Sequence, residues 1–224
     1  MAQARPPRAV LFDWRGTLVH DPPDEWWVRN ALLRAGRAAD NARVIELCDA
    51  LAEAADLPEV VAGQVDCDCS AALHREWSLM FYKRAGLDAE LALALYDLDL
   101  DPRSHPFYPD AGPALEALHS RGCRVAIVSD VHFDLRPEFA AKGFDRFVDA
   151  FVLSFEHGFQ KPNRHIFEIA LVTLGVAASD TLMVGDRPSR DGGATAAGIA
   201  TWLLPEGGSA DRPRGLGHLL GWAL

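Results

Sequence analysis

Titratable and hydroxyl side chains stand at the ends of apolar runs in this sequence. Four such points contain Asp13, Ser129 with Asp130, Lys161, and Asp186 with Asp191. Each of these side chains, if it were isolated, could cap a turn or lie in solvent. Charges are rarely gathered at the end of a buried sheet by chance, so we expect the four points to form one site.

These residue types fit phosphoryl transfer. A carboxylate can attack phosphorus and form an aspartyl-phosphate, and Asp13 is the expected nucleophile because it follows the apolar run Ala9–Phe12. Both reactants are anionic, so the site needs positive charge. Asp13, Asp186 and the backbone carbonyl of Arg15 are the expected ligands of Mg²⁺, which prefers oxygen donors.

The remaining residues have expected roles around the phosphoryl group. Lys161 would neutralise the charge of the phosphoryl group and of the nucleophile, and Asp191 would orient Lys161 or the waters on the metal. The substrate itself would be bound by Arg15, Thr17, Ser129 and Asp130. Ser129 and the amides of the turn would donate hydrogen bonds to phosphoryl oxygens.

The elements that must position these residues alternate between strand and helix patterns. The apolar runs AVLFDW, RVAIVSD, DAFVLSF, TLMVGD and IATWLL are typical of buried parallel strands. Helix patterns cover residues 110–122, 135–143, 163–175 and 188–198. This order predicts an α/β fold with a doubly wound parallel sheet, in which ligands bind beyond the carboxyl ends of the strands.

Residues 21–104 interrupt the alternation. They are rich in Ala and Leu at helical spacing and contain no good strand pattern, so we expect four or five helices inserted after the first strand. Residues 1–20 and 105–224 would then form the α/β core, and the insert would act as a cap or lid. Residues 205–215 are expected to form a loose tail before a short closing helix.

Composition narrows the class of protein. The chain has 224 residues, 49% of them hydrophobic, and a net charge of −10, which disfavours a protein that binds nucleic acid. The four cysteines show no disulfide framework, and no run is long enough for a membrane span, so we expect a cytoplasmic protein with free thiols. The segment DCDCS, residues 66–70, lacks a second ligand pair, so the sequence does not favour a metal site there.

The order FDWRGTL, VSD, QKP, GDRPSRD resembles the motifs of the haloacid dehalogenase superfamily of aspartate-nucleophile hydrolases. The resemblance implies a Rossmann-like core with a helical cap between the first two motifs. It assigns the nucleophile to Asp13, the phosphate-binding hydroxyl to Ser129 and the motif lysine to Lys161. It also implies that Asp186 and Asp191 are the acids of the metal site.

Arg15 departs from this pattern, because phosphatases of the superfamily carry a second Asp there. Arginine has no proton to exchange at neutral pH, and general acid–base assistance is typically worth about 10²–10⁴ in rate. In one interpretation the chain is still a phosphatase and Arg15 binds substrate. The proton is then unnecessary or comes from another group, and the candidate histidines are His20, His132 and His157.

Two other interpretations stay open. The chain could hydrolyse a carbon–halogen bond, since a halide leaves without a proton. Its pocket would then be lined by Trp26, Trp27, Arg29, Trp77, Phe81 and Tyr82. The metal-type acids of GDRPSRD disfavour this reaction. The chain could also be a regulator or binding protein that retains the pocket. The sequence favours a Mg²⁺-dependent phosphatase of a small phosphorylated metabolite, with no nucleic-acid or membrane partner; oligomeric state is not predicted.

Overall fold

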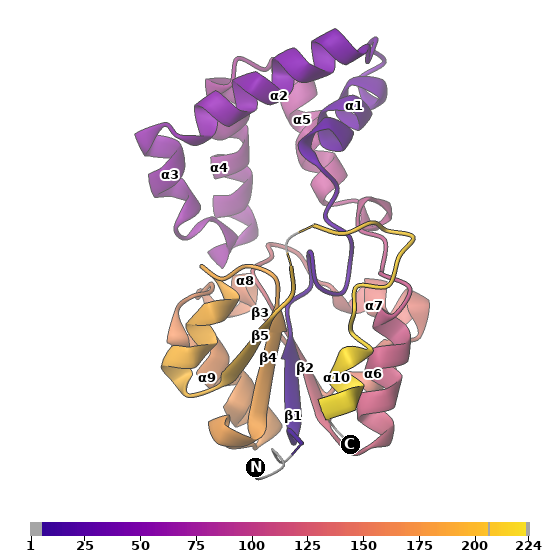
Figure 1. Ribbon diagram of the computed structural model, residues 1–224. Helices are drawn as coiled ribbons and strands as arrows, with labels where there is room; N and C mark the ends of the chain where they lie inside the picture. Colours follow the sequence, from indigo (N-terminus) through magenta and orange to yellow (C-terminus); the bar gives the residue numbers. More distant parts are fainter. Residues whose placement is uncertain (1–5, 206, 223–224) are drawn as a thin grey trace. The chain divides into compact units, whose positions relative to one another are not determined.

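The computed structural model of the chain describes residues 6–205 and 207–222 (Figure 1). It divides into two units, one formed by Met1–Asp21 with Pro106–Leu224 and the other by Pro22–His105. The expected core segments are 1–20 and 105–224, and residues 1–5, 206 and 223–224 of these segments lie outside the described residues.

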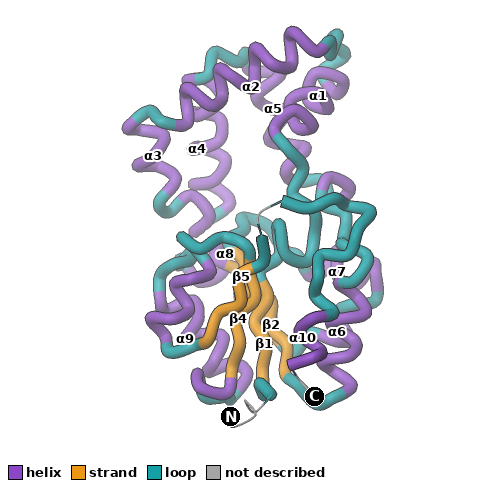
Figure 2. The backbone as a smooth tube through the Cα atoms, in the orientation of Figure 1, coloured by secondary structure: helices purple, strands orange, loops and turns teal. Residues whose placement is uncertain are grey.

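The first unit is built on a sheet, drawn in orange in Figure 2. Its five strands have the order β3-β2-β1-β4-β5. All neighbouring strands pair in parallel. The strands are β1 (Ala9–Phe12), β2 (Arg124–Ser129), β3 (Ala150–Leu153), β4 (Thr181–Gly185) and β5 (Ala200–Leu203). This topology confirms the predicted Rossmann-like α/β fold.

Both faces of the central strands are buried, which explains their continuous apolar runs. In β1, Val10 and Phe12 belong to one apolar cluster, together with residues of α6 (Ala111–Ser120) and α7 (Arg136–Lys142). Ala9 and Leu11 point to the other face and pack in a cluster with α9 (Arg164–Leu174). The other α-helices described in this unit are α8 (Ser154–His157) and α10 (His218–Trp222).

The structure differs from the expected helix over residues 188–198. The chain forms a 3₁₀-helix over Asp191–Ala197 instead. A Cβ on Gly193 would lie 2.7 Å from the backbone oxygen of Pro162. This close approach requires glycine, and adjacent glycines such as Gly192 and Gly193 disfavour a regular α-helix.

The segment expected to be a loose tail is anchored where the structure describes it; residue 206 lies outside the described residues. The carboxylate of Asp110 accepts hydrogen bonds from the amides of Arg214, Gly215 and Leu216 at 2.8, 2.9 and 2.8 Å. Three amides on one carboxylate hold the end of this segment against the start of α6.

The second unit is entirely helical. Its α-helices are α1 (Asp24–Arg34), α2 (Asn41–Ala55), α3 (Pro58–Gln64), α4 (Ala71–Arg84) and α5 (Ala89–Asp99), and short 3₁₀-helices cover Cys67–Cys69 and Pro102–Ser104. Side chains of Asp40, Ser70 and Asp88 cap the amino ends of α2, α4 and α5. The unit has its own apolar core, in which Leu32, Leu47 and Leu95 are buried.

Several aromatic side chains of this unit have packing partners within it. The indole of Trp27 donates to the Pro22 carbonyl at 3.0 Å, and that of Trp77 donates to the Val60 carbonyl at 2.9 Å. Trp77 also stacks on Phe81, with ring centroids 5.5 Å apart. These contacts assign Trp27 and Trp77 a structural role inside the helical unit.

Two further features bear on the class of protein. Cys48, Cys67, Cys69 and Cys123 form no disulfide bonds. Among the described residues, every helix is too short or too polar to span a bilayer.

Candidate active site

Parallel pairing brings the ends of three strands to one edge of the sheet. Phe12 of β1 is in register with Ile127 of β2 and with Val184 of β4. Asp13 follows Phe12 directly, and its amide donates to the Val184 carbonyl at 2.9 Å. Ser129 and Asp186 each lie two residues beyond the partners of Phe12, so the first, second and fourth predicted points meet at this edge.

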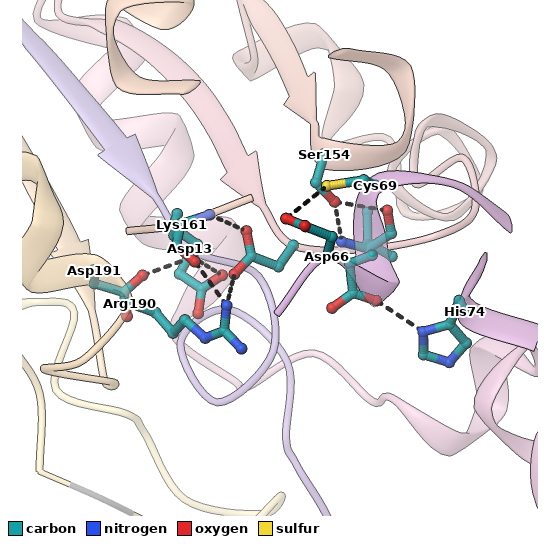
Figure 3. A network of polar contacts seen from close by, with 11 residues as sticks. Asp13, Asp66, Cys69, His74, Ser154, Lys161, Arg190 and Asp191 are labelled. Carbon is teal, nitrogen blue, oxygen red and sulfur yellow. Dashed lines mark hydrogen bonds and ion pairs between the residues drawn. The ribbon is translucent and has the colours of Figure 1, made fainter. Parts of the chain in front are cut away.

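Lys161 lies between the carboxylates of Asp13 and Asp191 (Figure 3). Its Nζ is 2.7 Å from Oδ1 of Asp13 and 2.6 Å from Oδ1 of Asp191, and all three side chains are fully buried. Burial lowers the pKa of Lys161, but the charges of Asp13 and Asp191 outweigh this effect and raise it. The ammonium group is therefore a fixed positive charge beside the predicted nucleophile.

Backbone amides fix the positions of two further acids. Oδ2 of Asp191 accepts from the amides of Asp186 and Arg187 at 3.1 and 2.9 Å. Oδ1 of Asp130 accepts from the amide of Lys161 at 2.7 Å. Burial, with a smaller contribution from Asp13, raises the pKa of Asp130 to about 6. Asp130 thus positions the backbone of the lysine.

Carboxylate oxygens of Asp13, Asp186 and Asp191 lie within 4.8 Å of one another. Oδ2 of Asp13 is buried and has no hydrogen-bond partner among the described residues. Burial raises the pKa of Asp186 to about 6, and the charge of Asp13 adds to the shift. Three carboxylates gathered this closely form an oxygen donor set that fits a hard divalent cation such as Mg²⁺.

The turn after Asp13 packs tightly on Asp186. A Cβ on Gly16 would lie 2.1 Å from Oδ2 of Asp186, and the φ of Gly16 is +77°. Oγ1 of Thr17 donates to Oδ1 of Asp186 at 3.5 Å. Thr17 therefore joins the cluster through Asp186, and its contact with substrate stays a prediction.

Arg15 is placed differently from the other predicted residues. The central carbon of its guanidinium lies 5.7 Å from the centroid of the Trp14 ring. Burial raises the pKa of Glu138 in α7 to about 7, and the charges of Lys142 and Arg15 oppose that shift. The charge of Arg15 therefore acts on Glu138 as well as lying against the Trp14 ring.

Three arginines of the site were not predicted. Arg190 donates to the Lys161 carbonyl at 2.7 Å and lies 4.0 Å from Oδ2 of Asp130. Arg187 has its pKa raised, because nearby acids, Asp13 first among them, outweigh the opposing effect of burial. Both are visible in GDRPSRD, whose acids alone were considered in the sequence analysis.

The third arginine comes from the C-terminal segment. Nε of Arg214 donates to the Gly16 carbonyl at 2.6 Å, and its Nη2 lies 4.0 Å from Oδ2 of Asp186. No local pattern predicts this contact, because 198 residues separate Arg214 from Gly16.

Aromatic side chains pack against two of the three candidate proton-transfer histidines. The ring of His20 packs edge-on against Tyr108 at 6.0 Å, and that of His132 packs against Phe133 at 5.1 Å. His157 is the last residue of α8. A role for any of the three in proton transfer stays a prediction.

Comparisons with known proteins agree with this geometry. Residues 7–198 match the family model described as haloacid dehalogenase-like hydrolase. The chain therefore belongs to the haloacid dehalogenase-like hydrolases and is an enzyme of that class. The resemblance inferred from the four motifs is confirmed at the level of the family.

Two curated relatives are phosphatases. The chain is 34% identical over 117 residues to a phosphoserine phosphatase of Thermus thermophilus, which is 51% of this chain and 46% of that enzyme. It is 29% identical over 219 residues to a ribulose-1,5-bisphosphate 5-phosphatase of Halopiger xanaduensis, covering 91% of this chain and 87% of that enzyme. The chain thus spans less than half of the first enzyme's length but most of the second's. These similarities support a phosphatase-type hydrolase.

Solved structures of both phosphatases and dehalogenases share the fold. A phosphatase of Thermococcus onnurineus matches with a TM-score of 0.59 and 23% identity, over 95% of this chain and 97% of that one. The L-2-haloacid dehalogenase of Xanthobacter autotrophicus matches with a TM-score of 0.62 and 23% identity, over 88% and 77%. Since similar scores come from both activities, the fold by itself does not distinguish them.

Proposed function

We propose that the chain is a Mg²⁺-dependent phosphatase of a small phosphorylated metabolite, acting through an aspartyl-phosphate on Asp13. The observation that carries the proposal is the state of this carboxylate. Its Oδ1 is held by Lys161 at 2.7 Å, whereas its Oδ2 is buried without a hydrogen-bond partner among the described residues. A carboxylate with one oxygen fixed and the other unpaired is suited to nucleophilic attack.

The neighbouring residues would support this attack on phosphorus. Lys161 would offset the charge that accumulates as two anions approach, and Asp191 keeps the ammonium in place through the 2.6 Å contact. Asp13 and Asp186 would hold the cation with the Arg15 carbonyl, and Asp191 would orient its waters. When bound, Mg²⁺ supplies positive charge to the phosphoryl oxygens. Ser129 and Thr17 would bind those oxygens.

Arg15 bears on the choice of substrate. Its side chain cannot donate a proton to the leaving oxygen or take one from the water that hydrolyses the intermediate. We therefore expect the best substrates to be those with good leaving groups, and Arg15 to bind a second anionic group of the substrate. The relatives favour a small metabolite, since the two described above are named as phosphatases of phosphoserine and of ribulose-1,5-bisphosphate.

The primary test is phosphate release from a panel of small phosphorylated metabolites, with and without Mg²⁺. Asp13→Asn and removal of Mg²⁺ by a chelator should each abolish turnover of the best substrate. Asp134→Asn, which changes an exposed acid that pairs with Arg136, is the matched control and should retain activity. Turnover that survives in Asp13→Asn would contradict the proposal.

Arg15→Asp tests the role of the departing residue. If Arg15 only replaced a lost acid, the substitution should raise activity on generic phosphate esters. If Arg15 binds substrate, the same substitution should abolish activity on the preferred substrate. Halide release from 2-haloacids without added metal would instead identify a dehalogenase, and retention of ligand binding without either activity would identify a binding protein.

Three expectations from the sequence stay predictions under this proposal. They are the cap role of the helical unit, the cytoplasmic location and the absence of nucleic-acid partners. The proposed chemistry requires none of them, so the activity assay tests the enzyme independently.

A further inference from the structure

Three potential metal ligands lie together in the helical unit, away in sequence from every residue of the candidate active site. They are Cys67 and Asp68, in the 3₁₀-helix Cys67–Cys69, and His74, near the start of α4. One ligand atom from each lies within 4.8 Å of the other two. Cys67 is 4% exposed, and the side chains of His74 and Asp68 are 13% and 20% exposed. The segment DCDCS therefore gains a partner that sequence spacing did not reveal.

His74 is held from both sides of its ring. Its Nδ1 lies 2.8 Å from Oδ1 of Asp68 (Figure 3), and its Nε2 lies 3.5 Å from Oδ2 of Asp99, the last residue of α5. Histidine ligands of metals usually donate the N–H of the second ring nitrogen to a carboxylate, which fixes the tautomer and the ring orientation. Asp99 is placed to accept that hydrogen bond while Nδ1 faces Asp68.

We infer that this cluster binds a borderline divalent cation of the Zn²⁺ class through Cys67 Sγ, an Asp68 carboxylate oxygen and His74 Nδ1. One sulfur, one nitrogen and one oxygen donor form a set that Zn²⁺ accepts and Mg²⁺ does not. A fourth position would be left for water. Tetrahedral coordination needs donor atoms about 3.2–3.8 Å apart, so rotations of side chains suffice to close the cluster.

Binding must release protons, because both Cys67 and His74 coordinate in their deprotonated forms. The proton on Nε2 of His74 stays with Asp99, which is placed to accept it. Cation binding should therefore tighten as the pH rises.

The site would have a structural role in the helical unit. Cys67 and Asp68 precede α4, His74 lies in α4, and Asp99 ends α5, so one cation would connect three segments. This inference is independent of the proposed phosphatase activity, because none of its residues belongs to that site.

Cobalt(II) is the probe for the experiment, since it enters zinc sites and a thiolate ligand gives it an intense near-ultraviolet charge-transfer band. The full chain in the Asp13→Asn background, with excess Mg²⁺, is titrated with Co²⁺ at pH 8. We expect the thiolate band to saturate at one equivalent and to disappear when Zn²⁺ is added. Cys67→Ser and His74→Gln should abolish the band. Cys48→Ser, which changes another free thiol of the helical unit, should leave it intact.

Asp99→Asn separates ligation from positioning. It should keep the thiolate band but weaken the affinity by about 10- to 100-fold, because the histidine loses its orienting acceptor. Circular dichroism checks that each variant is folded. If Cys67→Ser unfolds, calorimetry of Zn²⁺ binding to the parent chain in two buffers of different ionisation enthalpy still shows whether binding releases protons, as coordination by a thiolate requires.

Three results would overturn the inference. They are the absence of a thiolate band at micromolar protein and Co²⁺, a band that persists in Cys67→Ser, and cation binding without proton release. The first would leave His74 as only a link between two carboxylates, the second would identify another thiol as the ligand, and the third would exclude a thiolate ligand.

Discussion

Lys161 connects two acids of the candidate site. Its side chain is fully buried, and the buried carboxylates of Asp13 and Asp191 balance its charge. Asp13 lies 148 positions before Lys161 in the sequence. A buried pair of this kind contributes little net stability compared with apolar packing, but removing one partner leaves uncompensated charge. The lysine therefore affects stability and chemistry together.

Lys161→Met should destabilise the chain by about 3–5 kcal/mol, because Asp13 and Asp191 would stay buried without their cation. Urea unfolding at pH 7 measures the loss. Lys142→Met, which changes an exposed lysine of α7, is the control and should cost far less. Equal effects of the two substitutions would show that Lys161 is not held in a buried charge network.

Gly16 allows a second test at a single residue. Gly16 and Gly86 both have a φ of +77°, but nothing lies within 4 Å of a Cβ on Gly86, whereas one on Gly16 would meet Asp186 at 2.1 Å. Gly86→Ala should therefore cost only the strain of the left-handed conformation, about 1–2 kcal/mol.

Gly16→Ala should cost more than Gly86→Ala and should also remove phosphatase activity, because the Cβ displaces Asp186. Denaturation curves and phosphate-release assays on both variants measure the two effects. Retained activity in Gly16→Ala would show that the turn and Asp186 need not approach so closely.

Among the elements, the C-terminal segment has a larger role than its composition suggests. Its glycines and prolines predict a loose tail, yet Asp110 binds three of its amides, and Arg214 reaches the Gly16 carbonyl. The side chain of Arg214 is 5% exposed and lies over the ring of Tyr108. The C-terminal segment thus supports the turn that follows Asp13.

Asp110→Ala should release this segment. Hydrogen exchange of the amides of residues 214–216 should accelerate by at least 10-fold, because they lose their acceptor. The turnover number should also fall, since Arg214 would no longer hold the turn. Glu116→Gln, an exposed position on the same helix, is the control. Unchanged exchange at residues 214–216 would contradict the anchoring role.

At the scale of the whole molecule, folding brings four acids together from separate parts of the sequence: Asp13, Asp130, Asp186 and Asp191. Burial and mutual repulsion raise the pKa of both Asp130 and Asp186 to about 6. The folded chain therefore binds protons at these acids more tightly than the unfolded chain does. A divalent cation would compete with these protons.

Mg²⁺ affinity should therefore fall as the pH is lowered from 7.5 to 5, because Asp186 becomes protonated near pH 6. Above about pH 7 the affinity should be nearly constant. Calorimetric titration with Mg²⁺ across this range measures the effect. A flat profile between pH 5 and 7.5 would show that Asp186 is not a ligand.

The same shift has a consequence for stability without the cation. Because the folded pKa of Asp186 exceeds its unfolded value, its stabilising contribution is complete below about pH 4 and is lost as the pH rises through about 6. Asp186→Asn should thus raise the free energy of unfolding at pH 7.5 and have less effect at pH 4. Urea unfolding at both pH values, without divalent cations, tests this sign.

Much of the fold could be predicted because its signals are local. Apolar runs such as TLMVGD mark buried strands, and helix-period patterns mark the helical unit, whichever partners they pack against. The segment 188–198 forms a 3₁₀-helix over Asp191–Ala197, and its adjacent glycines explain only part of this difference from the expected helix. Gly193 is packed against the backbone of Pro162, which lies 31 positions earlier in the chain.

The sequence by itself determined the family and the order of the motifs, and it predicted Asp13 as the nucleophile, because each of these depends on residue type and spacing. Only the tertiary structure decided which oxygen of Asp13 is unpaired, that Arg214 supports the turn, and that His74 joins Cys67 and Asp68. These contacts depend on distances between side chains whose elements pack in three dimensions, and neither periodicity nor spacing encodes such distances.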